Sequence, residues 1–307
     1  MALLTLGFVM QTERTPGGAL PPVSPAGVLR RLRGQGIPWG SLTVLLLLII
    51  AAIGGETLAP WDPNALNLAD VFKPPAWHAN GTFAHLLGTD NLGRDIFSRI
   101  IAGARVSVTV ALYVIVLSGG VGSFIGLIAG FFGGMVDAVL MRLADIQMSI
   151  PSLALALVMA VVLDPSFTTV VIVIVVTYWT WYARIVRSEV LSLKERDYVA
   201  LARVAGCSNV TILRRHLLPN VANTLLVLAT LQVGQVIVFE ASLSFLGLGI
   251  QQPDVSWGLM LADARSYMTH AWWLITLPGV AIMLTCLASN LVGDWLRDTL
   301  DPRRKQR

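Results

Sequence analysis

The polar residues best suited to chemistry lie close together near position 90, where Asp90, Arg94 and Asp95 fall in one short segment. Carboxylates at this spacing can bind a metal ion or move a proton, but the same spacing is typical of a capped helix with local ion pairs. We expect the second arrangement, in which the cluster fixes a loop. His78 and His85 precede it and could hold a metal, although lone loop histidines more commonly serve as polar groups.

The sequence motifs of nucleotide-binding and hydrolytic enzymes are absent. There is no GxxxxGK[ST] loop to hold ATP phosphates, no HExxH and no GxSxG. Cys207 and Cys286 lie far apart and form no metal-binding cluster with histidine. The sequence therefore predicts no catalytic site, no cofactor and no metal site in this chain.

The composition indicates a membrane protein rather than a soluble one. Of the 307 residues, 55% are hydrophobic and only 13% are charged, whereas soluble domains carry roughly 25% charged residues. A membrane-spanning helix needs about 20 mostly apolar residues. Six runs meet this requirement: 34–55, 106–136, 146–163, 165–183, 217–239 and 266–293. We therefore expect an all-α polytopic protein with six transmembrane helices.

The positions of lysine and arginine predict the orientation. With the N-terminus inside, seventeen of the 22 basic residues fall in cytoplasmic segments, as the positive-inside rule requires. This N-in/C-in topology divides the chain into a cytoplasmic tail (1–38), a first transmembrane helix (39–60), an extracytoplasmic loop with an amphipathic helix (61–104), a five-helix core (105–296) and a second cytoplasmic tail (297–307).

Glu240 needs explanation because it ends a long apolar run. An ionisable side chain in a span is costly unless it faces protein, water or a partner. Two interpretations remain open. Glu240 either lies on a polar pathway or at an interface with another subunit, or it sits at the outer headgroup level and contacts solvent.

The longest cytoplasmic segment within the core, 188–220, has the pattern of two short helices. Asp197 is placed to cap the first, Gly206 to end it in the left-handed conformation, and Ser208 to cap the second. Leu218 and Pro219 then mark the start of the next span.

One face of this segment is suited to contact with another protein. The small residues Ala200, Ala202 and Ala205 would let a second surface approach closely, and Arg203, Arg214 and Arg215 add positive charge at the rim. A DNA-binding helix-turn-helix is disfavoured because the segment is short and tethered at both ends to the bilayer.

Segment 188–220 closely resembles the EAA coupling loop of permease subunits in ABC importers. That pattern reads Glu-Ala-Ala, three residues, Gly, nine residues, then Ile-x-Leu-Pro. Gly206 and Pro219 stand at the required separation and Leu218 precedes the proline. The sequence departs from the pattern elsewhere: Ala200 replaces Glu, Leu201 replaces the first Ala, Ala202 matches, and His216 replaces Ile.

Further segments resemble the dipeptide/oligopeptide/nickel type of these permeases, specifically the second, C-type subunit. They are residues 87–107 before the second span, Glu-Ala-Ser-Leu-Ser-Phe-Leu-Gly-Leu-Gly at 240–249, and the C-terminal stretch 294–302. The likeness covers roughly residues 40–303.

The resemblance implies a type I importer permease in the bacterial plasma (inner) membrane. Its implied partners are a homologous second permease, two ABC ATPase subunits or domains that use ATP and Mg, and an extracytoplasmic substrate-binding protein; no nucleic acid is implied. The residues implied in ATPase coupling are Asp197, Tyr198, Ala200, Ala202, Arg203, Gly206, Ser208, Leu218 and Pro219.

Two alternatives concern the cargo and the transport mechanism. The expected cargo is a di- or oligopeptide, but nickel chelates and glutathione-like peptides are carried by the same permease type. An ion-coupled secondary transporter would need paired intramembrane charges or inverted repeats. Neither is evident in the sequence, and segment 188–220 would then have no explanation.

Overall fold

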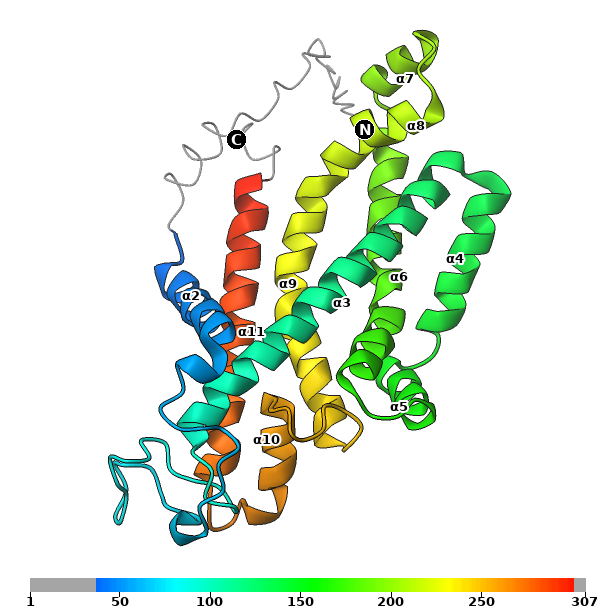
Figure 1. Ribbon diagram of the computed structural model, residues 1–307. Helices are drawn as coiled ribbons and strands as arrows, with labels where there is room; N and C mark the ends of the chain where they lie inside the picture. Colours follow the sequence, from blue (N-terminus) through cyan, green and yellow to red (C-terminus); the bar gives the residue numbers. More distant parts are fainter. Residues whose placement is uncertain (1–36, 301–307) are drawn as a thin grey trace, which may run out of the picture. The chain divides into compact units, whose positions relative to one another are not determined.

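The computed structural model describes residues 37–300 and is built from helices (Figure 1). Within this range the chain has no β-strand beyond one isolated bridge between Thr89 and Asp95. The α-helices are α2 (Trp39–Gly54), α3 (Ile96–Phe132), α4 (Gly134–Met148), α5 (Ser152–Val162), α6 (Phe167–Leu193), α7 (Asp197–Val204), α8 (Asn209–Ile212), α9 (Leu218–Phe245), α10 (Trp257–Ala264) and α11 (Trp273–Leu300). The all-α prediction is confirmed.

Five helical segments in the described range are long and apolar enough to cross a membrane. They are Trp39–Thr57, Ile96–Phe132, Phe167–Leu193, Asn209–Phe245 and Trp273–Leu300. The pair α4 and α5 gives a sixth span if the two are counted as one, although they meet at 85°. The prediction of a continuous helix over 146–163 is therefore wrong. Pro151 disfavours helical geometry in the residue before it and separates α4 from α5.

The expected boundaries of the first outer loop are also wrong at its C-terminal end. The segment 61–104 is predicted to be an extracytoplasmic loop with an amphipathic helix, but α3 begins at Ile96 and runs without a break to Phe132. Its 37 residues rise about 55 Å at 1.5 Å each, well beyond the roughly 30 Å of a hydrocarbon core. The first turns of α3 therefore extend beyond a span and carry the polar residues of the loop.

The structure describes the predicted first span in full and the two predicted tails only in part. The helix α2 ends at Gly54 and passes into a short 3₁₀ turn, Gly55–Thr57, so the expected first span 39–60 is three residues too long. The predicted cytoplasmic tail 1–38 lies almost wholly outside the described residues. At the other end α11 continues to Leu300, so residues 297–300 of the predicted tail 297–307 are helical. Residues 301–307 lie outside the described range.

The closest helix packing in the bundle is between α3 and α6. Three glycines four residues apart, Gly122, Gly126 and Gly130, lie along the contacting face of α3. A β-carbon at Gly122 would lie 2.3 Å from the Trp179 carbonyl oxygen, and one at Gly126 would lie 2.5 Å from that of Ala183. Small residues at this spacing let helix backbones approach closely in a membrane. The stripe fixes the separation of the two helices.

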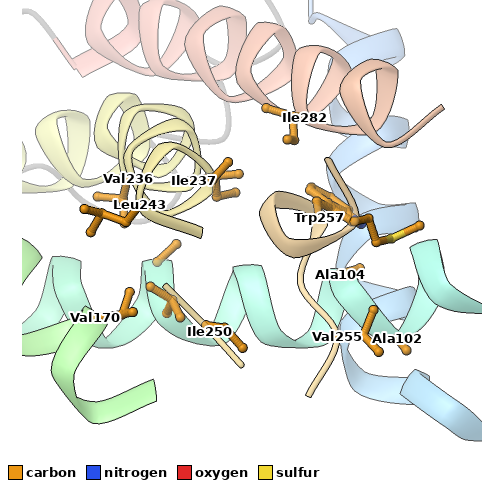
Figure 2. Packing of buried hydrophobic residues seen from close by; sticks show 14 of the residues in the cluster. Ala102, Ala104, Val170, Val236, Ile237, Leu243, Ile250, Val255, Trp257 and Ile282 are labelled. Carbon is orange, nitrogen blue, oxygen red and sulfur yellow. The ribbon is translucent and has the colours of Figure 1, made fainter. Parts of the chain in front are cut away.

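The largest hydrophobic core lies at the end of the bundle that carries α10. Figure 2 shows Trp257 of α10 and Ile282 of α11 in one cluster with Ala104 of α3 and Ile237 of α9. The Trp257 indole nitrogen donates to the Ile100 carbonyl at 2.9 Å. The apolar face of α10 is buried inside the chain, because this helix packs against α9 and α11.

Candidate functional site

The loop between α6 and α9 forms a compact, rigid unit. Its first helix, α7, ends with two hydrogen bonds of a Schellman motif: the Gly206 amide donates to the Arg203 carbonyl at 3.0 Å, and the Cys207 amide donates to the Ala202 carbonyl at 3.0 Å. Gly206 has φ +77, the left-handed conformation that glycine reaches at low cost. The predicted backbone geometry of Gly206 is therefore confirmed.

The two predicted N-caps have different outcomes. The Ser208 hydroxyl accepts a hydrogen bond from the Thr211 amide at 3.3 Å and so caps α8. The prediction that Asp197 caps α7 is wrong, because the cap position is Arg196 and no side chain bonds there. Asp197 is the first residue of the helix, where its negative charge still favours the positive end of the helix dipole.

The second short helix is not a separate element. After α8 the chain passes through a π-helical turn, Leu213–Leu217, directly into α9, so residues 209–245 form one continuous helical segment. Pro219 lies in the first turn of α9, where its missing amide costs no hydrogen bond. The loop and α9 are therefore joined without a break in the helix.

One face of the loop is buried against the membrane helices. Val199, Ile212 and Leu217 are fully buried and pack with Val186 of α6 and Phe131 of α3. Ala202 belongs to this cluster at 8% exposure. The expectation that Ala202 faces another protein is wrong, because it lies on the inner side of α7 while Ala200 lies on the outer side.

The opposite face of α7 is unusually apolar for a polar loop. Tyr198, Leu201 and Val204 lie three residues apart and are 38%, 68% and 88% exposed. Residues at this spacing share one helix face. Burial raises the pKa of the Tyr198 hydroxyl above its ordinary value, so it remains a neutral hydrogen-bond donor. We call Tyr198, Leu201 and Val204 the α7 strip.

Basic residues hold the loop to the helices beneath it. The Arg203 guanidinium lies 5.7 Å from the centre of the Phe131 ring, a cation–π distance. The Lys194 ammonium donates to the Gly130 carbonyl at 3.0 Å, at the end of α3. Farther along α6, Arg187 makes a bidentate pair with Asp137 of α4 at 2.5 and 2.6 Å. These contacts join α3, α4 and α6 at the base of the loop.

Glu240 is at the other end of α9 and is fully buried. The Ser244 hydroxyl donates to one carboxyl oxygen at 2.7 Å and the Ser107 hydroxyl to the other at 3.4 Å, and Ser256 also hydrogen-bonds the carboxyl group. These serines come from α9, α3 and the segment before α10. The interpretation that Glu240 contacts solvent is wrong, and its carboxyl group is not presented on a pathway or partner surface either.

This geometry predicts that Glu240 acts as a structural tie. Glu240→Gln keeps the side-chain volume and an acceptor for the serines, so its stability should stay within about 1 kcal/mol of wild type. Glu240→Ala leaves a cavity beside unpaired hydroxyls and should cost about 2–5 kcal/mol. Apparent unfolding midpoints of the purified protein in detergent would measure the difference. Equal midpoints for the Ala and Gln variants would contradict the structural role.

The cluster near position 90 is a buried ion-pair network, as expected. The Asp95 carboxylate caps α3 by accepting from the Ser98 amide at 2.8 Å. Arg94 pairs with Asp90 at 2.6 Å and reaches Asp263 of α10 at 3.3 Å. The long-range pair with Asp263 is invisible in the sequence pattern.

The two loop histidines have different environments. His78 is exposed, but His85 is only 6% exposed. The His85 ring lies 2.9 Å from the Asp95 carboxylate and 3.6 Å from that of Asp70. A hydrogen bond from Lys73 lowers the pKa of the Asp70 carboxyl, which keeps Asp70 ionised beside the ring. His85 therefore anchors the loop and is not a surface group. No cluster of potential metal ligands occurs within residues 37–300.

Known proteins establish the family. Residues 122–306 match the model of the binding-protein-dependent transport system inner membrane component, and residues 26–75 match the N-terminal TM domain of oligopeptide transport permease C. The chain belongs to this family of inner membrane transport components. The matched region contains the whole loop between α6 and α9.

Several curated relatives are similar over most of their length. The di/tripeptide transport system permease protein DppC of Pseudomonas aeruginosa is 42% identical, over 87% of this chain and 88% of the relative. The probable D,D-dipeptide permease DdpC of Escherichia coli is 38% identical, over 89% of each. The nickel permease NikC of Escherichia coli is 41% identical, over 85% of this chain and 92% of the relative.

The fold is shared with solved importers. The MetNI methionine ABC transporter, described in inward-facing conformations, matches with a TM-score of 0.57 at 15% identity, over 67% of this chain and 98% of that chain. An amino acid ABC transporter crystallised with histidines matches with a TM-score of 0.52 at 14% identity, over 66% of this chain and 95% of that chain. These likenesses support the importer permease fold that the sequence predicted.

Sequence reasoning missed two features of the site. Leu201 and Val204 were not singled out, although their spacing with Tyr198 marks one helix face. The glycine stripe of α3 was also missed, although its GxxxGxxxG pattern is readable in the sequence. His216, which departs from the family pattern, lies 6.2 Å from the Tyr198 ring and links α7 to the π-helical turn.

Proposed function

We propose that this chain is a permease subunit of an ATP-driven importer of di- or oligopeptides in the bacterial plasma membrane. The observation that carries the proposal is the α7 strip, an exposed apolar face on a loop that otherwise packs against α3, α6 and α9. Exposed apolar surface on a rigid element is typical of a protein interface. The peptide permeases among its relatives support this cargo class.

The α7 strip would bind an ATPase subunit or domain. Two such ATPases would bind ATP and Mg, and their closure would push on α7. Because α7 packs on α3 and α6, and because the loop continues without a break into α9, this push would tilt membrane helices rather than only deform a loop.

The remaining parts of the importer lie outside this chain. A homologous second permease would complete the pathway, and an extracytoplasmic binding protein would deliver the cargo. Alternate tilting of the two permeases would open the pathway first outward and then inward. The chain itself supplies half of the pathway and one mechanical link.

A second cargo class follows from one relative. NikC is 41% identical to this chain and is named as a nickel permease. Uptake assays in a strain that lacks other peptide and nickel importers would compare labelled dipeptides with nickel. Growth on dipeptides that depends on this chain would support the first proposal. Chain-dependent nickel uptake without peptide uptake would replace it.

The N-in/C-in orientation can be tested by labelling. His78 is exposed on the predicted outer loop and Val204 on the predicted inner one. In a protein whose Cys207 and Cys286 are replaced, we expect an impermeant thiol reagent to label His78→Cys in intact cells but Val204→Cys only after lysis. Labelling of Val204→Cys in intact cells, with no labelling of His78→Cys, would show that the topology is the reverse of the predicted one.

A further inference from the structure

A long apolar groove runs along the surface between α3 and α9. Its volume is about 390 Å³, and its walls include Gly119, Gly120 and Phe124 of α3 and Leu218 and Leu225 of α9. Leu218 and Leu225 are seven residues apart, so they lie on one face of α9 and define the direction of the groove along the helix.

Two adjacent glycines create the hollow. A β-carbon at Gly120 would meet no atom within 4 Å, so the space above it is open. A β-carbon at Gly119 would touch the Tyr182 ring at 3.4 Å, and that ring forms part of the groove wall. The two glycines therefore leave open space along this face of α3.

The surface around the groove is apolar and faces outward. Val116 and Phe124 are 61% and 64% exposed, as expected for side chains that meet hydrocarbon. Ser123 and Tyr182 also contribute to the walls, but their hydroxyl oxygens are buried and make no hydrogen bond with described residues. The groove therefore offers hydrocarbon contacts to a ligand, and not hydrogen bonds. This disfavours a peptide as its occupant.

Positive charge lies at one end of the groove. Arg214 and Arg215 lie in the π-helical turn, four and three residues before Leu218, which lines the groove. Both side chains are exposed. Neither forms an ion pair within residues 37–300, in contrast to Arg184 and Arg187, which pair with Asp145 and Asp137. An anion beside these arginines would complement their charge.

We propose that the groove binds one acyl chain of an anionic phospholipid whose phosphate lies beside Arg214 and Arg215. The acyl chain would run along α9 from Leu218 toward Ala229. Because α9 continues from the loop that carries α7, the lipid would contact the same helix that transmits the movement of the loop. The proposal needs only that the chain spans a membrane, and it does not depend on the cargo.

Native mass spectrometry of the assembled transporter, released from nanodiscs, tests this site. With nanodiscs of phosphatidylglycerol we expect the wild type to retain the lipid, and with phosphatidylcholine to retain much less. The paired substitution Arg214→Gln and Arg215→Gln should weaken phosphatidylglycerol retention by about thirtyfold, since each basic residue near a membrane contributes about 1 kcal/mol. Gly120→Leu should remove it by filling the groove.

Matched controls separate the possible outcomes. Gly40 of α2 also has open space at its β-carbon position, so Gly40→Leu should retain the lipid. Inorganic phosphate alone should not displace the lipid, and displacement by it would show that the arginines form only an anion site. Equal retention of both lipids by the wild type would overturn the proposal. So would a Gly120→Leu variant that keeps its lipid but no longer co-purifies with the second permease, since a partner helix would then occupy the groove.

Discussion

Gly206→Val should nearly abolish substrate uptake while the protein still inserts and assembles. The Gly206 φ of +77 belongs to the left-handed region, which costs a non-glycine residue about 1–2 kcal/mol and a β-branched residue more. A valine would therefore break the Schellman motif and redirect α8 relative to α7. The space around Gly206 is open, so the effect arises from backbone conformation and not from a clash.

Asparagine supplies the matched control at this position. It tolerates the left-handed conformation better than other non-glycine residues, so Gly206→Asn should retain much more uptake than Gly206→Val. Reconstituted uptake and ATP hydrolysis stimulated by loaded binding protein would be measured together, with assembly checked by co-purification. Wild-type uptake by Gly206→Val would show that the loop is not the mechanical link.

Gly126→Leu should prevent stable accumulation of the protein in the membrane. The β-carbon would lie 2.5 Å from the Ala183 carbonyl oxygen and 2.9 Å from the Val186 β-carbon. These atoms belong to the backbone and stem of α6, so no flexible side chain can move away. We expect a loss of more than about 3 kcal/mol and a several-fold fall in abundance.

Gly120 provides the comparison within the same helix. It lies six residues earlier on α3 and faces open space, so Gly120→Leu should accumulate like the wild type. Immunoblots of membrane fractions, with expression of both variants matched, would measure the difference. Normal amounts of Gly126→Leu would mean that α3 and α6 do not pack through the glycine stripe.

The sequence predicted the helical class and most of the spans because long apolar runs have few alternatives in a membrane. The predicted start of α3 is too late, because the predicted outer loop 61–104 contains the charged Arg99, which belongs to the helix. Arg99 is in fact only 2% exposed and contacts Asp90 and Asp263. A charged residue is compatible with a helix start when its partners are supplied by α10, which lies far away in the chain.

The candidate loop was predictable where local chemistry decides the structure. Gly206 and Ser208 behave as their residue types require, since turn and cap preferences depend on a few neighbouring atoms. Ala202 was misplaced because which face of α7 is buried depends on Phe131 and Val186, which come from distant helices. The position of Glu240 was not predictable for the same reason, because its serine partners come from three separate segments.

The central claim is that the α7 strip contacts an ATPase. A photoreactive amino acid in place of Val204, which is 88% exposed, tests this contact in the assembled transporter, with the same substitution at the exposed His78 as a control. We expect ultraviolet light to join the Val204 variant to the ATPase, with a yield that changes when ATP is bound, and the His78 variant not to join it. A Val204 variant that joins only to lipid or to nothing, in a transporter that still imports its cargo, would contradict the account.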